Sequence, residues 1–159
     1  MSNYAYDHSI AMCEPMLIFE IHGNPKPQKQ TQGVVVPRYD IGGNQKGHSI
    51  RMHDPSKMSK QMIQWQIAPQ APKEPLKGAI AMDIIFYLPI PASTHKSQKQ
   101  HMINGTLRPY KRPDFDNLAY IVTNALKGIV YRDDGQVVRC LIEKYYHDQP
   151  KTVIKVWEI

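Results

Sequence analysis

The sequence predicts a single α+β domain, with a mixed β-sheet packed against two main helices. Its 159 residues fit one domain that is large enough to bury a core. Hydrophobic residues make up 42%, which is typical of a globular chain. The patterns run strands, helix, strand, helix, strands, and this order favours a mixed sheet. We expect residues 1–15 to form an N-terminal extension, mobile or packed on the surface, and residues 16–159 to form the domain.

The first elements are expected to be extended. The apolar run Met16–His22 predicts a strand, which the glycine and prolines of residues 23–27 end. A second extended segment is expected at Val34–Arg38, and residues 40–46 should form a loop.

A first helix should begin at Asp54-Pro55, because Asp is a favoured N-cap and Pro is favoured at the first helical position. We expect it to run to about Ile67. Three apolar side chains at helical spacing predict a buried face on this helix: Met58, Met62 and Trp65.

The second half contains a strand, a long loop, a helix and two further strands. Ala79–Leu88 is rich in apolar and aromatic residues and predicts a central strand. Residues 92–113 contain no Asp or Glu and should form a long polar loop of the kind that is often functional or mobile. Strands are expected at Val137–Tyr146 and Thr152–Glu158.

The second helix should start near Asp116 and end at Lys127-Gly128, where the glycine suits a C-terminal cap. A short strand, residues 129–131, should follow. The helix carries one apolar stripe: Leu118, Ile121, Val122, Ala125 and Leu126.

The formal net charge is +6 and the pI is near 9.3. This excess suits a polyanionic partner, either nucleic acid or an acidic membrane surface, although a merely soluble basic protein has the same charge. No stretch is apolar for long enough to cross a membrane. Two cysteines, Cys13 and Cys140, make neither a disulfide framework nor a zinc motif, so we expect a reducing cytoplasm.

Four acids stand in two short motifs of this basic chain. Asp114 and Asp116 lie at the mouth of the second helix, and Asp133 and Asp134 lie in the turn beyond it. Converging carboxylates repel one another unless a cation neutralises them, and Mg²⁺ or Mn²⁺ prefers such oxygen ligands. A metal held there would serve phosphodiester hydrolysis. The structural alternatives are an ordinary helix cap for Asp116 and an ordinary turn for Asp133-Asp134.

Basic residues cluster on both sides of the acids and can neutralise DNA phosphates, although a solvated basic surface looks the same. Phe115 is either a core residue, which we favour, or an aromatic ring that stacks on a base. The predicted DNA-binding residues are Lys26, Lys29, Arg38, Lys96, Lys99, Arg108, Lys111 and Arg112.

Two segments carry a family resemblance. One reads D-F-D-N-L from Asp114, and the other reads N-A-L-K-G-I-V-Y-R-D-D-G-Q-V from Asn124. Together they resemble the signature of the RusA family of Holliday-junction resolvases, which is D-x-D-N-L, a helix ending in A-L-x-G, and D-D-x-Q-V. The resemblance covers residues 16–159. Weaker matches are Gly23–Gln30, Phe86–Pro91 and Lys144–Tyr146.

The resemblance implies a homodimeric, Mg²⁺- or Mn²⁺-dependent endodeoxyribonuclease that acts in DNA recombination and repair. Such enzymes, common in phages, prophages and bacteria, resolve four-way junctions by paired symmetric nicks, one per subunit. By position, Asp114, Asp116 and Asp134 would be the metal-binding catalytic acids. Asp133 would be a neighbouring metal-site acid, and Asn117 would orient or cap the site.

One position departs from the family pattern. Many members carry a lysine, thought to assist catalysis, three residues after the asparagine, and here that residue is Tyr120. Lys127, Lys111 or a loop lysine could substitute, and the sequence does not choose among them. Thr31 also stands where an arginine is usual. Two alternatives therefore stay open: a branched-DNA-binding protein with weak or no catalysis, and a nuclease for other branched DNA.

Overall fold

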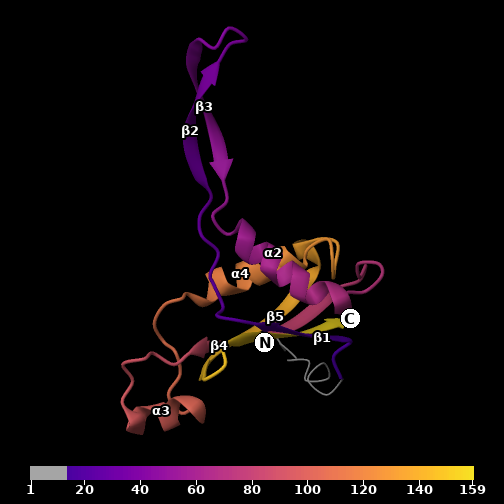
Figure 1. Ribbon diagram of the computed structural model, residues 1–159. Coiled ribbons are helices and arrows are strands. Elements are labelled where there is room, and N and C mark those ends of the chain that lie inside the picture. Colours follow the sequence, from indigo (N-terminus) through magenta and orange to yellow (C-terminus); the bar gives the residue numbers. More distant parts are fainter. Residues whose placement is uncertain (1–13) are drawn as a thin grey trace, which may run out of the picture.

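The computed structural model describes residues 14–159, and its centre is a four-stranded mixed sheet (Figure 1). The strand order is β1-β6-β4-β5. Strand β6 pairs antiparallel with β1 and β4, whereas β4 and β5 are parallel. The predicted α+β class with a mixed sheet is confirmed. The strands are β1 (Leu17–His22), β4 (Ile80–Pro89), β5 (Val137–His147) and β6 (Lys151–Glu158).

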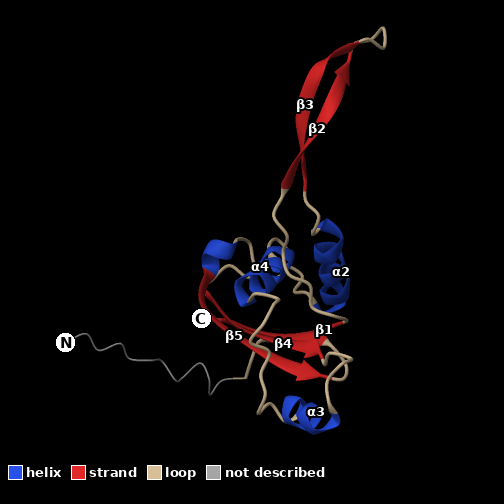
Figure 2. Ribbon diagram, turned by 90° about the vertical axis from the view of Figure 1, so that its left-hand side faces the viewer, coloured by secondary structure: helices blue, strands red, loops and turns tan. Residues whose placement is uncertain are grey.

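Helices cover the sheet unequally. Helices α2 (Lys57–Ile67) and α4 (Phe115–Leu126) lie on one side, and α3 (Lys96–Ile103) lies on the other (Figure 2). Two 3-10 turns, η1 (Ala68–Gln70) and η2 (Asp134–Gln136), complete the elements. No helix among residues 14–159 is long and apolar enough to cross a membrane.

The core lies between the sheet and the α2–α4 layer. The stripe predicted for α4 is confirmed, because all five of its residues are buried. Strand β4 is buried along most of its length because it pairs on both sides. The largest fully buried side chains include Tyr131, Phe19, Phe86, Ile67, Ile84 and Ile154.

Strands β2 (Gln32–Tyr39) and β3 (Gln45–His53) form a separate antiparallel hairpin, called the arm below. Both views show it projecting far from the body of the domain (Figures 1 and 2). The first strand and the turn were predicted, but β3 was not.

Three expectations were wrong in detail. Residues 92–113 are not all loop, because Lys96–Ile103 form α3, which packs Met102 into the protein. Residues 129–131 form no strand: Tyr131 makes only isolated bridges, to Leu76 and Lys127. The first helix begins at Lys57 with Ser56 as its N-cap residue, whereas Asp54 accepts a hydrogen bond from the Ser56 N–H at 2.9 Å. Of the predicted extension, residues 1–13 lie outside the described residues.

The predicted buried face of α2 is also wrong. Met58, Met62 and Trp65 are exposed, and Trp65 is 64% exposed. The helix instead turns Ile63 and Ile67 towards the core, so the other apolar stripe faces outwards. An exposed stripe of large apolar side chains is a feature of interaction surfaces.

Candidate active site

The first acidic motif lies at the start of α4. Asp114 occupies the N-cap position with extended backbone, but its side chain makes no capping hydrogen bond. Asp116 lies in the first helical turn, and its Oδ1 accepts the Asn117 N–H at 2.8 Å. Both acids are exposed. Asp116 is therefore not the cap residue, and it lies in the helical turn that follows the cap.

The segment before this motif is held in place from β5. Lys144 Nζ donates to the Pro113 carbonyl at 3.0 Å and to the Lys111 carbonyl at 3.3 Å. Arg108 donates from Nε to the Lys144 carbonyl at 2.8 Å and lies over the Tyr145 ring, 3.4 Å from its centroid. Arg108 thus has structural partners, while Lys144 fixes the chain immediately before Asp114.

The second acidic motif follows a tight reversal after α4. Gly128 follows the C-cap residue Lys127 with a φ of +77°, the conformation expected of a glycine just beyond a helix. Its N–H donates forward to the Tyr131 carbonyl at 2.7 Å and not back to a carbonyl of α4. Tyr131 is fully buried, and its hydroxyl donates to the Thr123 carbonyl at 2.8 Å. Burial raises the pKa of Tyr131, which keeps the hydroxyl a donor. The buried, hydrogen-bonded Tyr131 therefore fixes the position of the backbone where the acidic turn begins.

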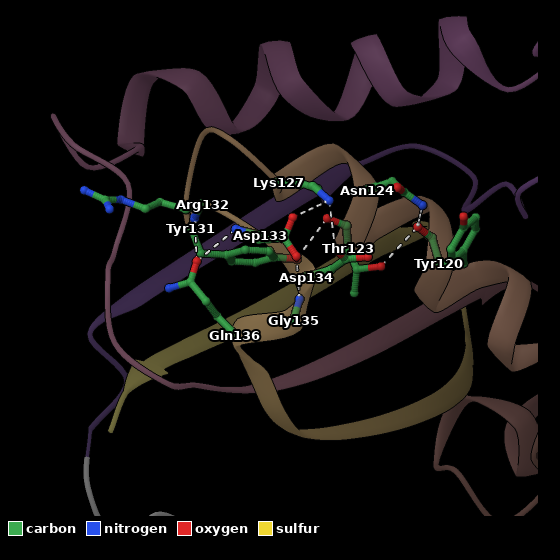
Figure 3. Close-up of polar contacts among 10 residues, drawn as sticks. All are labelled: Tyr120, Thr123, Asn124, Lys127, Tyr131, Arg132, Asp133, Asp134, Gly135 and Gln136. Carbon is green, nitrogen blue, oxygen red and sulfur yellow. Dashed lines mark hydrogen bonds and ion pairs between the residues drawn. The ribbon is translucent and has the colours of Figure 1, made fainter.

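Gln136 fastens this turn to the connector before β4. Its Oε1 accepts the N–H groups of Arg132 at 2.8 Å and Asp133 at 2.9 Å (Figure 3). Its Nε2 donates to the carbonyls of Leu76 at 3.0 Å and Gly78 at 2.8 Å. One amide side chain thus satisfies four backbone groups. Only the Q of the D-D-x-Q-V match pointed to this residue in the sequence.

Replacing Gln136 by Ala should lower the free energy of unfolding by about 1–3 kcal/mol, because partly buried carbonyls lose their donors. Chemical denaturation of the purified chain measures this. Gln149→Ala, at an exposed site in the β5–β6 turn, is the matched control and should change the value by less than about 0.5 kcal/mol. Equal stability of the two variants would show that Gln136 does not hold the turn.

Lys127 lies between the two acids of the turn (Figure 3). Its Nζ is 2.6 Å from Asp133 Oδ2 and 2.9 Å from Asp134 Oδ1. The hydrogen bond from Lys127, with a second from the Gly135 N–H, lowers the pKa of Asp133 to about 2. The hydrogen bonds to Asp133 and Asp134 raise the pKa of Lys127. Asp133 also caps η2 in a capping box with Gln136. Asp133 therefore has the ordinary structural role of a turn residue. Asp134 makes fewer hydrogen bonds within the turn than Asp133 does.

The donor types suit a hard divalent cation, but their arrangement is incomplete. Within residues 14–159, no group of three or more His, Cys, Asp and Glu side chains is placed to hold a metal ion. The pair Asp133 and Asp134 converges, and an ammonium group occupies the place between them. A metal shared with Asp114 and Asp116 therefore needs Lys127 to leave this pair and the two motifs to approach.

A second segment reaches the acidic motif from the start of the domain. The Gln28 N–H donates to the Asn117 carbonyl at 2.8 Å. The two segments enclose an open hollow of about 390 Å³, and Tyr120, 56% exposed, stands at its wall. The hollow is lined by Gln28, Lys29, Gln30, Thr31, Asn117 and Tyr120.

Most of the predicted DNA-binding residues are exposed. Arg108 is the exception, and Lys99 forms an exposed ion pair with Asp148 at 3.1 Å. Phe115 is 59% exposed, so the preferred core assignment was wrong: the buried part of α4 begins at Leu118. The exposed set comprises Lys26, Lys29, Arg38, Lys96, Lys99, Lys111 and Arg112.

Comparison with known proteins identifies the family. Residues 23–157 match the family described as Endodeoxyribonuclease RusA. The chain belongs to the RusA endodeoxyribonuclease family. It is similar as well to "Uncharacterized protein YqaN" of Bacillus subtilis (strain 168), with 30% identity over 145 residues that cover 89% of this chain and 95% of the relative.

Membership of the RusA family gives the two acidic motifs a common context. The match includes both, together with Gln136 and Lys144, whose hydrogen bonds fix the backbone on either side of them. From the sequence, the acids were assigned a role, whereas Gln136 and Lys144 appeared only within the family match and neither side chain was given a partner.

Proposed function

We propose that this chain is a divalent-metal-dependent endodeoxyribonuclease. It resolves Holliday junctions by paired symmetric nicks during DNA recombination and repair in the cytoplasm. The observation that carries the proposal is the presence of two exposed acidic motifs, one at the start of α4 and one at η2, in a member of an endodeoxyribonuclease family. The second motif already binds a cation, the Lys127 ammonium.

In this proposal Asp114, Asp116 and Asp134 hold Mg²⁺ or Mn²⁺, with Asp133 beside them. The bound metal would supply an activated water and stabilise charge on the phosphate. Lys29, which is exposed and lines the hollow, and the other exposed cations predicted to bind DNA would hold its backbone without reading its sequence. Asn117 orients the start of α4 through its backbone contact with Gln28.

Lys127 is the substitute that the geometry favours for the lysine replaced by Tyr120. Its Nζ lies within 3 Å of both acids of the turn, whereas Lys111 Nζ lies near the Tyr110 ring, 5.7 Å from its centroid. Lys127 would neutralise the acids in the free protein and turn to the phosphate when metal and DNA bind.

The same ion pairs motivate a second candidate, a branched-DNA-binding protein with little or no catalysis. If Lys127 never leaves Asp133 and Asp134, the turn cannot accept a metal. A nuclease that prefers flaps or other branches is a variant of the first candidate.

A panel of end-labelled substrates separates these candidates. Four-way junctions, three-way junctions, flaps and linear duplex are each incubated with Mg²⁺, Mn²⁺ or a chelator. The proposal predicts symmetric nicks in the four-way junction that need a metal. Binding of the junction with no cut in either metal supports the second candidate. Preferential cutting of flaps supports the variant, and no binding of any branched substrate overturns the proposal.

We propose further that the active form is a homodimer, as the family resemblance implies. The exposed stripe on α2 supplies an apolar surface that a second copy would cover. Beside it lies a half-open apolar cavity of about 210 Å³, with Met62, Ile63 and Phe86 in its wall. In a two-fold dimer such a pocket on each copy can receive an anchor from the other.

Trp65→Ser should therefore weaken self-association at least about tenfold without unfolding the chain, because Trp65 is mostly solvent-exposed within one copy. Sedimentation equilibrium without DNA measures this. Tyr110→Ser removes a comparably exposed aromatic side chain outside α2 and should leave the association constant unchanged. An unaltered constant in Trp65→Ser would remove α2 from the interface.

A further inference from the structure

The arm presents two different faces. Directly opposed residues of an antiparallel pair share a face, so Val35 and Ile50 lie together, with the Gly33–Met52 pair beside them. The other face carries the pairs Val34–Arg51 and Gln32–His53. Large side chains on the arm are exposed, and Ile50 and Met52 are about 70% exposed. A two-stranded hairpin without a partner is marginally stable in water, which points to a binding role.

The arm is basic. Residues 32–53 contain three cations and one acid, a net charge of +2, and two histidines. The acid, Asp40, builds the turn: its Oδ1 accepts the Asn44 N–H at 2.9 Å, and Lys46 lies 4.0 Å from its other oxygen. Arg38 and Arg51 are exposed. The positive net charge of the arm favours a polyanionic partner over an uncharged, apolar one.

The tip of the arm holds a single apolar side chain clear of the protein. Ile41 is fully exposed, with a relative exposure of 110%. The turn beneath it is closed by backbone bonds from the Asp40 N–H to the Asn44 carbonyl and from the Gly43 N–H to the Asp40 carbonyl. Gly43 takes the positive φ that the turn requires. Ile41 thus projects from a hydrogen-bonded turn, with Arg38 before the turn and Lys46 after it in the sequence.

The root of the arm is fixed beside the first acidic motif. The Lys29 N–H donates to Ser56 Oγ at 2.7 Å, and Gln28 Nε2 donates to Asp54 Oδ1 at 3.3 Å, so the two ends of the arm are tied together. The Gln28 N–H reaches the Asn117 carbonyl. An eight-residue strand spans about 26 Å. The tip of the arm therefore lies roughly 26 Å from its root, far enough to contact DNA beyond the acidic motifs.

We propose that the arm is a DNA probe whose tip inserts Ile41 between base pairs at a branch point, with Arg38 and Lys46 on the flanking phosphates. Aliphatic wedges of this kind unstack base steps in other DNA-binding proteins, and basic neighbours hold the backbone beside them. A branch point is a favourable place, because base pairs there are more easily unstacked than in a continuous duplex. The proposal rests on the branched-DNA function proposed above.

Unstacking is measured with 2-aminopurine placed at the branch point of a four-way junction or in the middle of one branch. The Asp116→Asn chain is used throughout, so that no substrate is cut. The arm proposal predicts a fluorescence rise at the branch point only. Ile41→Ser should abolish the rise and weaken junction binding about tenfold. Ile41→Leu keeps an aliphatic wedge and should retain both.

The salt dependence gives an independent readout. Replacing both Arg38 and Lys46 by Gln should reduce the slope of log affinity against log salt by about two. Val35→Ser, on the apolar face of the arm, is the control and should leave the fluorescence rise intact.

The outcomes separate this inference from the proposed function. Junction binding by Ile41→Ser with an unchanged fluorescence rise overturns the wedge and leaves the nuclease proposal standing. An Ile41→Ser chain that loses self-association without DNA shows that the tip contacts protein instead, which also overturns it. A parent chain that binds no branched DNA overturns both proposals.

Discussion

Asp116→Asn should reduce nicking of a four-way junction at least about 100-fold while junction binding is retained. Asp116 is exposed in the first turn of α4, and Asn keeps its shape but removes the charge that would bind a metal. Changes to residues that merely support metal ligands typically lower activity 10- to 100-fold, so a ligand should exceed this. Single-turnover cleavage and gel-shift titration on the same labelled junction measure both quantities.

The matched control is Asp148→Asn, the same exchange at an exposed acid in the turn between β5 and β6. It should leave the cleavage rate within a factor of about two, because an exposed ion pair contributes little. Full cleavage by Asp116→Asn would remove Asp116 from the reaction. Loss of junction binding in the same variant would assign it to DNA contact instead.

Tyr131→Ala should lower the free energy of unfolding by about 3–5 kcal/mol, the range for a large buried aromatic. Tyr131 is fully buried where the chain reverses from α4 into the acidic turn. Tyr131→Phe keeps the ring and loses only the hydroxyl bond to the Thr123 carbonyl, so the loss should be about 1 kcal/mol. Denaturant unfolding of the three chains checks both values.

The two Tyr131 variants also separate stability from site geometry. Tyr131→Phe should nick junctions at nearly the normal rate below its unfolding midpoint, since the ring still supports the turn. A Tyr131→Ala chain as stable as the parent would show that the reversal is held by other contacts, such as that between the Gly128 N–H and the Tyr131 carbonyl.

Much of the fold was predictable because local patterns decided it. The apolar stripe and glycine of α4, and the apolar run of β4, carry their structure within a few residues. The missed elements lack such patterns. Strand β3 has only two large apolar side chains, Ile50 and Met52, and neither is buried. Helix α3 is eight residues long and buries only Met102.

The candidate site likewise has a part that could be predicted from the sequence and a part that could not. Its acids stand in short motifs that the sequence displays, whereas its supports depend on contacts across the fold. Gln136 bonds to Leu76, 60 residues away, and Lys144 to Pro113, 31 residues away, and no local spacing signals either contact. The exposed face of α2 was mispredicted because helical spacing identifies an apolar stripe but not which of two stripes the core takes.

The central claim is that carboxylates from the start of α4 and from the turn at η2 share a divalent cation. Calorimetric titration of Mn²⁺ into the intact chain and into Asp116→Asn and Asp134→Asn tests it without DNA or cleavage. We predict one saturable site in the parent chain that both substitutions weaken at least about tenfold. Unchanged Mn²⁺ affinity in either variant would contradict a site shared by the two motifs.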